Sequence, residues 1–254
     1  MTKPKKTIAI IMAAGKGSRM RELTISTPKP LLEVHSKSFL EYNLEGLFPL
    51  VDEFVIVVNY HADQIIAKFG DSFTFGGQKK PIKYAFMQSP TNGTLDAFRC
   101  GVYNGSKEAD SKFEQNNNYI VTNADHILQN SYYQTLSQQI QDNPDQVCLM
   151  TNKLEDKTLA KNYGVVIVDQ NSNYEQIIEK PPEFISDLIS IGLYYLPSFA
   201  LNYFPQIRLE NYIGEEGMPS LINNLAKEHD VKVLSSKDEY LTASTPEDLK
   251  RLNK

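Results

Sequence analysis

The chain is poor in cysteine and contains no long hydrophobic run. Its two cysteines, Cys100 and Cys148, lie far apart among apolar neighbours and lack the spacing of a metal site. Such isolated cysteines are typical core residues of a protein from a reducing compartment. No segment approaches the run of about eighteen apolar residues that a membrane-spanning helix needs. We therefore expect a cytoplasmic protein without a membrane partner.

Neither a strong charge of one sign nor an internal repeat is present. The chain has 26 Lys and Arg against 31 Asp and Glu, a net charge of −5, and its basic residues form no long tract, which argues against nucleic acid as a partner. No hexapeptide array of a left-handed β-helix occurs. The short apolar run after the basic N-terminus leads directly into a glycine-rich loop, so we do not interpret it as a secretion signal. The 254 residues fit one large α/β domain, residues 1–254, better than two small ones.

What is present is an alternation of strand-like and helix-like segments. Apolar strand-like runs occupy 8–14, 53–59, 82–87, 119–123 and 147–151, with amphipathic stretches near 38–48, 61–69, 94–105 and 131–141. Ser38 and Glu41 have the spacing of a capping box. This pattern predicts a mostly parallel central sheet covered on both faces by helices, a three-layer α/β/α fold. Its ligands should bind at the carboxyl ends of the strands.

The pattern changes after residue 160. Strands at hairpin-like spacing are predicted over 164–169, 174–180 and 188–196, and helical segments over 198–204 and 217–228. A final helix should begin at Thr245, because Pro246 follows in the first turn and an acid, Asp248, stands three residues on. We interpret residues 151–254 as a β-rich extension of the same domain.

The first apolar run ends in a loop of glycine and charge, Gly15-Lys16-Gly17-Ser18-Arg19. Glycines allow the backbone to approach a ligand closely, and consecutive N–H groups in such a loop bind anions. Arg19 and, further along, Lys29 add positive charge, which predicts a polyphosphate site. Spacing excludes two rival motifs. A P-loop needs Lys-Ser/Thr after its second glycine, where Ser18-Arg19 stand, and a Rossmann fingerprint needs a third glycine where Met20 stands.

The whole stretch resembles the signature of the sugar-1-phosphate nucleotidylyltransferases, (A/G)-G-x-G-x-R-x-x-x-L-T-x-x-x-P-K-P-(L/M). The matching positions are Ala14, Gly15, Gly17, Arg19, Leu23, Thr24, Pro28, Lys29, Pro30 and Leu31. The resemblance implies a Rossmann-like nucleotidyltransferase fold that transfers a nucleotidyl group from an NTP to a sugar 1-phosphate. It assigns nucleotide binding to Ala13, Ala14, Gly15, Lys16, Gly17 and Ser18. Arg19 would hold the β- and γ-phosphates of the NTP, and Lys29 would neutralise the α-phosphate.

A second segment runs from Gln88 to Ala97 and resembles the family's Q-x-x-x-x-G-T-x-x-A. In that pattern the Gln88 side chain and the Gly93 backbone read the edge of the nucleobase. Thr94, the next residue, is also assigned to nucleotide binding. A primary amide offers both a donor and an acceptor, which suits a base edge. The segment favours uracil or thymine only mildly.

A third segment contains Asp125, which follows the predicted strand 119–123. A carboxylate at the carboxyl end of a strand, facing a triphosphate, is a hard oxygen ligand for Mg²⁺. By resemblance Asp125 bridges the metal to the α-phosphate, and Mg²⁺ is the expected cofactor. The next residue, His126, is interpreted as structural, because the reaction needs no general base. His35, His61 and His229 share no spacing with it.

The extension carries three short segments that resemble Y-G-V-V, V-E-K-P and x-G-I-Y of the same family. They place Gly164, Glu179, Lys180 and Gly192 at the sugar phosphate, with Glu179 on sugar hydroxyls and Lys180 on the phosphate. Residues 151–254 are thus the expected sugar-phosphate half, and residues 1–150 the nucleotide half. Adjacent residues of a strand point to opposite faces. Glu179 and Lys180 can therefore serve one ligand only if the strand end twists or bulges.

One position departs from the family pattern. Where the family has W-x-D-(I/T)-G-T-P-E-D-L, with a second metal-binding Asp, this chain has Thr242. A hydroxyl is a far weaker Mg²⁺ ligand than a carboxylate. Three interpretations stay open: water, Asp125 and phosphates suffice; Asp238 or Glu239 substitutes; or the protein binds its ligands but reacts slowly.

Two other functions therefore compete with sugar nucleotidyl transfer. One is a cytidylyltransferase acting on a non-sugar phosphate such as phosphocholine, since the loop motif is shared with such enzymes. The other is a regulatory subunit that binds an NDP-sugar without turnover. Among sugar acceptors, the phosphates of glucose, N-acetylglucosamine, mannose, heptose and muramic-type sugars stay open. The fourteen tyrosines could serve an interface between copies of the chain.

Overall fold

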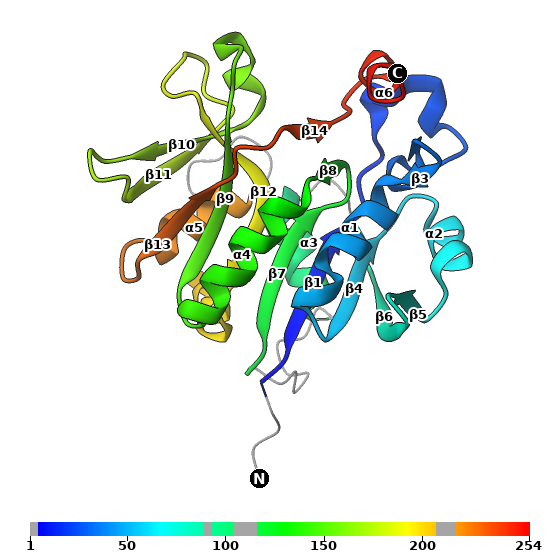
Figure 1. The fold of residues 1–254 in the computed structure, drawn as a ribbon, viewed down its shortest axis with the longest axis horizontal. Helices are drawn as coiled ribbons and strands as arrows, with labels where there is room; N and C mark the ends of the chain where they lie inside the picture. Colours follow the sequence, from blue (N-terminus) through cyan, green and yellow to red (C-terminus); the bar gives the residue numbers. More distant parts are fainter. Residues whose placement is uncertain (1–4, 89–92, 104–115, 207–216) are drawn as a thin grey trace.

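The computed structural model describes residues 5–88, 93–103, 116–206 and 217–254. Its centre is a ten-stranded sheet in which β11, β10, β12, β7, β1, β4, β6 and β5 are neighbours in that order, with β9 and β13 attached through β12 (Figure 1). Two small two-stranded sheets, β14 with β8 and β2 with β3, stand apart from it.

The strands are β1 (Thr7–Met12), β2 (Glu33–Val34), β3 (Lys37–Ser38), β4 (Glu53–Val58), β5 (Ser72–Phe75), β6 (Gln78–Phe86), β7 (Asn118–Asn123), β8 (His126–Leu128), β9 (Val147–Lys153), β10 (Gly164–Val168), β11 (Tyr174–Glu179), β12 (Leu188–Leu196), β13 (Val231–Ser235) and β14 (Tyr240–Thr242). The α-helices are α1 (Phe39–Leu47), α2 (Ala62–Phe69), α3 (Gly93–Val102), α4 (Asn130–Asp142), α5 (Met218–Leu225) and α6 (Pro246–Leu252). The 3-10 helices are η1 (Ser18–Thr24), η2 (Lys29–Leu31), η3 (Phe48–Leu50), η4 (Lys157–Asn162) and η5 (Ser198–Gln206).

The first half of the chain forms the parallel part of the sheet. Strand β1 pairs in parallel with β4 on one side and with β7 on the other, and β4 pairs in parallel with β6. All six residues of β4 are buried. Strands buried on both faces read as continuous apolar runs, which is why the sequence revealed them. Their shared carboxyl ends lie at one edge of the sheet, where the loop after β1 and the residues after β7 emerge together.

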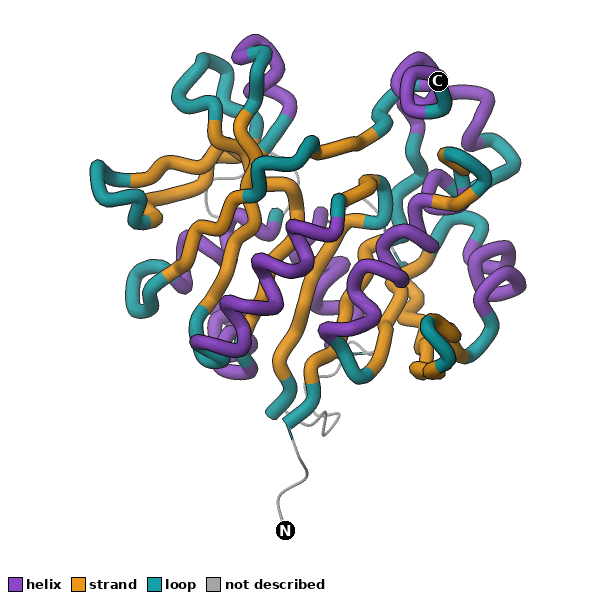
Figure 2. Tube along the Cα trace, viewed as in Figure 1, coloured by secondary structure: helices purple, strands orange, loops and turns teal. Residues whose placement is uncertain are grey.

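Helices cover both faces of this sheet (Figure 2). One face packs on α1 and α4 through Leu40, Leu44 and Leu136, and the other on α3 and α5 through Phe98 and Leu221, all fully buried. The predicted three-layer α/β/α fold with a mostly parallel core is therefore confirmed. Among the described residues, no helix is long and apolar enough to cross a membrane.

The second half joins the same sheet in antiparallel fashion. Strand β12 pairs antiparallel with β7, β9 and β10, and β10 pairs antiparallel with β11. The predicted run at 147–151 forms β9, which runs in the same direction as β7 because both are antiparallel to β12, but β12 from later in the chain takes the place beside β7. Strand β9 instead pairs in parallel with β13, a strand the sequence did not predict.

The helix ends follow the sequence signals. Ser38 and Glu41 form a reciprocal capping box at the start of α1, and Thr245 and Asp248 form another at the start of α6. The predicted helical segment 198–204 is a 3-10 helix, η5, rather than an α-helix. The predicted run 82–87 falls in β6, but its hairpin partner β5 was not predicted, because the residues of β5 are only partly buried or exposed. Of the two cysteines, Cys148 is buried and Cys100 is half-buried.

Candidate active site

The loop after β1 is shaped by its glycines. Ala13 and Ala14 are buried and belong to the cores on opposite faces of the sheet, while Gly15 is exposed. Gly17 has a φ of +62°, and a Cβ atom added there would lie 3.0 Å from the Cβ atom of Lys29. Glycine is therefore required at 17 both for its backbone conformation and for the close approach of Lys29.

Thr24 holds this loop together from within. Its buried Oγ1 lies 3.0 Å from the carbonyl oxygen of Gly17 and 3.3 Å from that of Arg21. Arg21 has a φ of 53° and a ψ of −125°, so it interrupts the helical turn of η1. Arg19 lies on the exposed side of the same turn. The loop thus presents Arg19 to solvent while Thr24 fixes the backbone beneath it.

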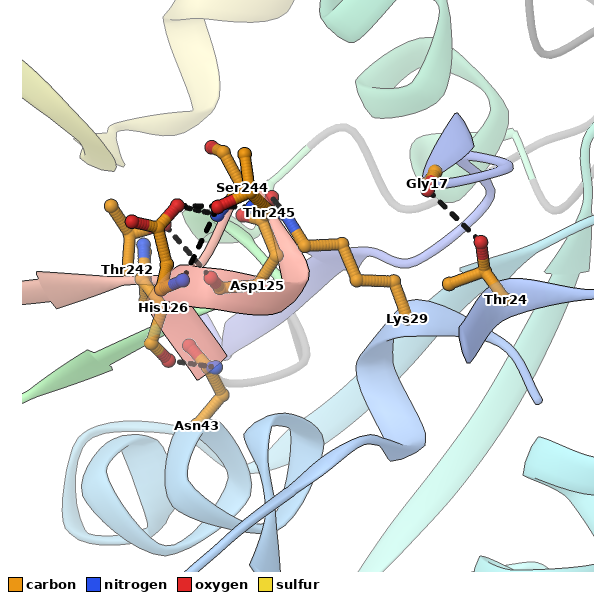
Figure 3. Close-up of polar contacts among 10 residues, drawn as sticks. Gly17, Thr24, Lys29, Asn43, Asp125, His126, Thr242, Ser244 and Thr245 are labelled. Atoms are coloured by element: carbon orange, nitrogen blue, oxygen red, sulfur yellow. Dashed lines mark hydrogen bonds and ion pairs between the residues drawn. The ribbon is translucent and has the colours of Figure 1, made fainter. Parts of the chain in front are cut away.

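Lys29 and Asp125 meet at the edge of the sheet (Figure 3). The Nζ atom of Lys29 lies 2.6 Å from Oδ2 of Asp125. The Lys29 side chain is 11% exposed and the Asp125 side chain 38% exposed, so the carboxylate faces solvent more than its partner does. Desolvation raises the pKa of Asp125, but the charge and hydrogen bond of Lys29 lower it more, and the net pKa lies below its usual value. The carboxyl group is therefore ionised.

His126 lies beneath this pair and is fully buried. Nδ2 of Asn43 donates a hydrogen bond to the carbonyl oxygen of His126 at 3.1 Å (Figure 3). The Nε2 atom of His126 is 3.0 Å from Oγ1 of Thr122. Burial lowers the pKa of His126 to about 4. The imidazole is therefore neutral and without access to solvent, which agrees with a structural role.

Thr242 occupies the position of the second metal-binding Asp in the family pattern. It lies opposite His126 in the β8–β14 pair, and its Oγ1 donates a hydrogen bond to the backbone oxygen of Asp125 at 3.1 Å. Asp238 and Glu239 are exposed and precede Tyr240, which already pairs with Leu128, so the register carries them away from Asp125. Neither acid stands in for the missing carboxylate.

The donor set at Asp125 fits only one kind of magnesium site. Among the described residues, no three His, Cys, Asp or Glu side chains cluster as metal ligands. Asp125 supplies one carboxylate and Thr242 one hydroxyl, which is already donated to a backbone oxygen. Mg²⁺ is often held by one or two carboxylates with water and substrate phosphates. The residues fit a site of that kind and do not fit a site made of protein ligands alone.

In the second half, Glu179 and Lys180 come together at the end of β11. Lys180 has a φ of 44°, and its Nζ atom lies 3.2 Å from Oε1 of Glu179. Its backbone N–H donates to the carbonyl oxygen of Tyr163 at 2.9 Å. The left-handed conformation brings two adjacent side chains to the same side, which is the twist that the sequence required. Gly164 pairs with Glu179 across β10 and β11, and a Cβ atom at Gly164 would lie 3.1 Å from Oε2 of Glu179.

Gly192 connects the two halves at strand β12. Its φ is +75°, and a Cβ atom there would lie 2.2 Å from Nδ2 of Asn123, at the end of β7. The pairing of β12 with β9 shifts register between Ser190 and Tyr194, so Gly192 lies within a bulge. Only glycine allows β12 to approach the strand end that leads to Asp125.

The predicted nucleobase segment is described only at its ends. Gln88 is exposed just after β6, and residues 89–92 lie outside the described part of the chain. Gly93, with a φ of +85°, begins α3. The Oγ1 atom of Thr94 accepts a hydrogen bond from the backbone N–H of Met218 at 2.9 Å. The Thr94 hydroxyl therefore caps another helix.

Sequence reasoning missed Tyr240, which links the two halves. Its ring packs edge-to-face on His126 at 5.9 Å and on Tyr163 at 6.4 Å between ring centroids. Burial raises the pKa of Tyr163, Asp125 raises it further, and Arg19 lowers it. Tyr163 therefore lies within electrostatic range of Asp125 and Arg19. No periodic pattern marks Tyr240, because β14 is only three residues long.

Comparisons with known proteins bear on the family and on the fold. A family model described as nucleotidyl transferase matches residues 8–239. The chain is 26% identical, over 97% of its length, to bifunctional protein GlmU of Methanocaldococcus jannaschii, of which it covers 53%. It is 28% identical, over 85% of its length, to UTP–glucose-1-phosphate uridylyltransferase of Synechocystis, of which it covers 55%. It is 30% identical, over 74% of its length, to the mannose-1-phosphate guanylyltransferase catalytic subunit beta of Drosophila melanogaster, of which it covers 47%.

The chain thus spans about half the length of these curated relatives. A crystal structure described as a glucose-1-phosphate thymidylyltransferase from Bacillus anthracis, in complex with sucrose, has a similar fold. The TM-score is 0.79 at 20% sequence identity, and the match covers 97% of this chain and 94% of that one. A likeness at that identity bears on the fold alone.

Proposed function

This chain belongs to the nucleotidyl transferase family, and we propose that it transfers a nucleotidyl group from an NTP to a sugar 1-phosphate. The products are an NDP-sugar and pyrophosphate. The observation that carries the proposal is the contact of Lys29 with Asp125, 2.6 Å apart at the carboxyl edge of the parallel strands. It unites the anion-binding loop and a strand-end carboxylate at the edge where such folds bind ligands.

The proposed reaction needs positioning and charge neutralisation rather than a general base. An oxygen of the sugar phosphate, already anionic at neutral pH, forms a bond to the α-phosphorus of the NTP. The bond from the α-phosphorus to the bridging oxygen breaks in line, and its electron pair leaves with pyrophosphate. Fixed positive charge near the two phosphates stabilises this transition state. The neutral, buried His126 supports a mechanism that uses no imidazole base.

We assign the nucleotide contacts to the loop after β1. The backbone from Ala13 to Ser18 would cradle the triphosphate, and the exposed Arg19 would hold its β- and γ-phosphates. When the nucleotide binds, the ammonium group of Lys29 would leave the Asp125 carboxylate and contact the α-phosphate. Gln88 and Gly93 would contact the nucleobase. The Thr94 hydroxyl is already bonded to Met218, which favours a supporting role for this residue.

Asp125 is the residue we propose to hold Mg²⁺, together with the triphosphate and water. When bound, the ion would supply positive charge shared between the two substrates. The sugar phosphate would lie against Gly164 and Gly192, with the Glu179 carboxylate on its hydroxyls and Lys180 on its phosphate. The convergence of Glu179 and Lys180 on one side of the strand end supports this assignment.

Both halves are proposed to act as one domain, since β12 from the second half pairs with β7 from the first. NTP and sugar 1-phosphate are cytoplasmic metabolites, and the sparse cysteines fit the same compartment. The partners are small molecules, and assembly into a homo-oligomer stays a prediction.

One observation favours a second candidate, a subunit that binds an NDP-sugar without turnover. Thr242 offers only a hydroxyl at Asp125, and that hydroxyl is donated to a backbone oxygen. Such a site would hold a divalent cation weakly and react slowly.

The deciding experiment measures pyrophosphate release with Mg²⁺ for each of UTP, dTTP, GTP, CTP and ATP. The acceptors are the 1-phosphates of glucose, N-acetylglucosamine and mannose, with phosphocholine as a non-sugar acceptor. Release with one sugar phosphate is expected, and it identifies base and acceptor together. Release with CTP and phosphocholine alone would replace the sugar by a non-sugar acceptor. Silence across the panel, with thermal stabilisation by NDP-sugars, would overturn the proposal in favour of the binding subunit.

A further inference from the structure

Helix α5 lies between the two halves of the proposed site. It packs on the same face of the sheet as α3, where Leu221 and Leu225 share a core with Leu95 and Phe98. Helix α3 begins at Gly93, within the proposed nucleobase segment, and β11 ends at Glu179, the proposed sugar ligand. Helix α5 contacts both elements.

The N-terminal end of α5 is hydrogen-bonded to the nucleotide half. Its first residue, Met218, donates its backbone N–H to Oγ1 of Thr94 at 2.9 Å. The first N–H groups of a helix have no partner within the helix. The residue before it, Gly217, has no side chain with which to cap them. Thr94 of α3 supplies the cap, so the start of α5 is fixed relative to the start of α3.

The middle of α5 is tied to β11 through one side chain, Asn223. Its Oδ1 accepts from the backbone N–H of Ile177 at 2.9 Å, and its Nδ2 donates to the carbonyl oxygen of Ile177 at 2.9 Å. The hydroxyl of Tyr174 also donates to Oδ1, at 2.6 Å. The amide therefore binds both backbone groups of one strand residue, as a neighbouring strand would.

The hydrogen bonds from Asn223 lie along the edge of β11 that pairs with no other described strand. Strand β11 is the edge of the sheet and pairs only with β10 among the described strands. Ile177 precedes Glu179 by two residues, and Lys180 follows in its left-handed conformation. Edge strands with unpaired backbone groups open more readily than central ones. Without Asn223, the backbone N–H and C=O of Ile177 would lose the hydrogen bonds that they form on the side away from β10.

We propose that Asn223 is a positioning residue for Glu179 and Lys180, and that α5 sets this pair relative to the nucleotide half through Thr94. Asn223 touches no substrate in this proposal and acts through the backbone of β11. From Met218 to Asn223 the helix rises about 7.5 Å, so the link is short and rigid. The inference rests on the proposed function for its kinetic consequence, but its structural consequence is independent of any reaction.

The kinetic test compares Asn223→Leu with Asn224→Leu, using the NTP and sugar 1-phosphate that give the fastest pyrophosphate release. The two variants make the same change at adjacent positions of α5. Among the described residues, Nδ2 of Asn224 has no hydrogen-bond partner, which makes it the matched control. Asn223→Leu is expected to raise the KM for the sugar phosphate about tenfold, with the KM for the NTP within about twofold. Equal effects of both variants would overturn the proposal.

A double-variant cycle separates positioning from general destabilisation. If Asn223 acts through Glu179, Asn223→Leu should change the KM for the sugar phosphate by less than about twofold in a Glu179→Gln background. A destabilised fold would give the same fold-change in both backgrounds. Additive effects would therefore overturn the positioning role even if Asn223→Leu alone is impaired.

Hydrogen exchange in the ligand-free protein tests the same inference without any reaction. Amides of Tyr174–Lys180 should exchange at least about tenfold faster in Asn223→Leu than in Asn224→Leu. Thr94→Val, which removes the cap of α5, should accelerate the same segment. Unchanged exchange in Asn223→Leu would overturn the positioning role, and unchanged exchange in Thr94→Val would overturn the link to the nucleotide half. A silent substrate panel, in contrast, would count against the proposed function alone.

Discussion

The ammonium group of Lys29 and the carboxylate of Asp125 lie 2.6 Å apart, although the two residues are 96 positions apart in the chain. In the ligand-free protein the two charges neutralise each other. A triphosphate must therefore compete with Asp125 for Lys29, and a cation must compete with Lys29 for Asp125. When the triphosphate and the cation bind together, this competition disappears, because the triphosphate takes Lys29 away from Asp125 and the cation takes Asp125 away from Lys29. The ion pair thus couples anion and cation binding at one point.

Replacing Lys29 should impair the reaction more than the fold. Lys29→Met keeps the length of the side chain but removes the charge, and we expect pyrophosphate release to fall on the order of hundreds-fold. Arg19→Ala should cause a loss of the same order. The control is Lys37→Met, since Lys37 also forms a 2.6 Å ion pair, with Glu45, away from the site. A loss of less than about threefold in Lys29→Met or Arg19→Ala would contradict the assigned role.

Restoring a carboxylate beside Asp125 should tighten magnesium binding. Thr242 donates its hydroxyl to the backbone oxygen of Asp125, so an acid at 242 stands next to the Asp125 carboxylate. We expect Thr242→Asp to lower the dissociation constant for Mg²⁺ at least about tenfold in calorimetric titration of the ligand-free protein. Thr242→Asn introduces a side chain of nearly the same shape as Asp but without the charge. It should leave the Mg²⁺ affinity within about twofold of the wild-type value. Equal affinities of the two variants would show that position 242 does not face the cation.

The two glycines of the loop should differ in their tolerance of alanine. Gly17 has a φ of +62°, and an added Cβ would meet the Cβ of Lys29 at 3.0 Å, whereas a Cβ at Gly15 meets nothing within 4 Å. We expect Gly17→Ala to lower the free energy of unfolding by about 1–3 kcal/mol. Gly15→Ala should change it by less than about 0.5 kcal/mol. Urea unfolding measures both values, and equal losses would contradict the strained geometry.

The capping box of α1 should make stability depend on pH in the acid range. Burial raises the pKa of Glu41, but hydrogen bonds from Lys68 and Ser38 lower it more, so the folded pKa lies below 4.5. The ionised carboxylate therefore stabilises the fold fully above pH 4.5, and this contribution is lost as the pH falls through the folded pKa. At pH 7 we expect Glu41→Gln to lower the free energy of unfolding by about 1 kcal/mol.

The difference between wild type and Glu41→Gln should shrink steadily below pH 4.5, as measured by denaturant unfolding at several pH values. Ser38→Ala removes the hydroxyl that donates to the Glu41 carboxylate and accepts from the Glu41 backbone N–H, and its difference from wild type should shrink in the same pH range. A difference that stays constant down to pH 2 would contradict the assignment of the low pKa to this contact.

The elements that the sequence predicted are those with a local cause. The buried strands β1 and β4 appear as continuous apolar runs, and the capping boxes at Ser38 and Thr245 depend on residues only three positions apart. The loop from Gly15 to Arg19 was recognised for the same reason, since its glycines and charges are contiguous. Strand β13 was missed, because its five residues lack a strong alternation and are defined by their pairing with β9.

The partners within the site could not be predicted in the same way. Nothing near Thr94 in the chain indicates that its hydroxyl caps a helix beginning at Met218. Nothing near Tyr240 indicates that its ring packs between His126 and Tyr163. These contacts join residues that are far apart in sequence, and each depends on how β12 and β14 return to the first half of the sheet.

The sequence by itself determined the family, the parallel core and the residue types of the site, because these follow from short patterns of apolarity, glycine and charge. Only the tertiary structure decided that Lys29 neutralises Asp125, that Thr242 bonds to the backbone of Asp125 and that Lys180 turns back onto Glu179. The physical reason is that hydrogen bonds and ion pairs act over a few ångströms. Residues that are far apart in the chain come within that distance only when the whole sheet has formed.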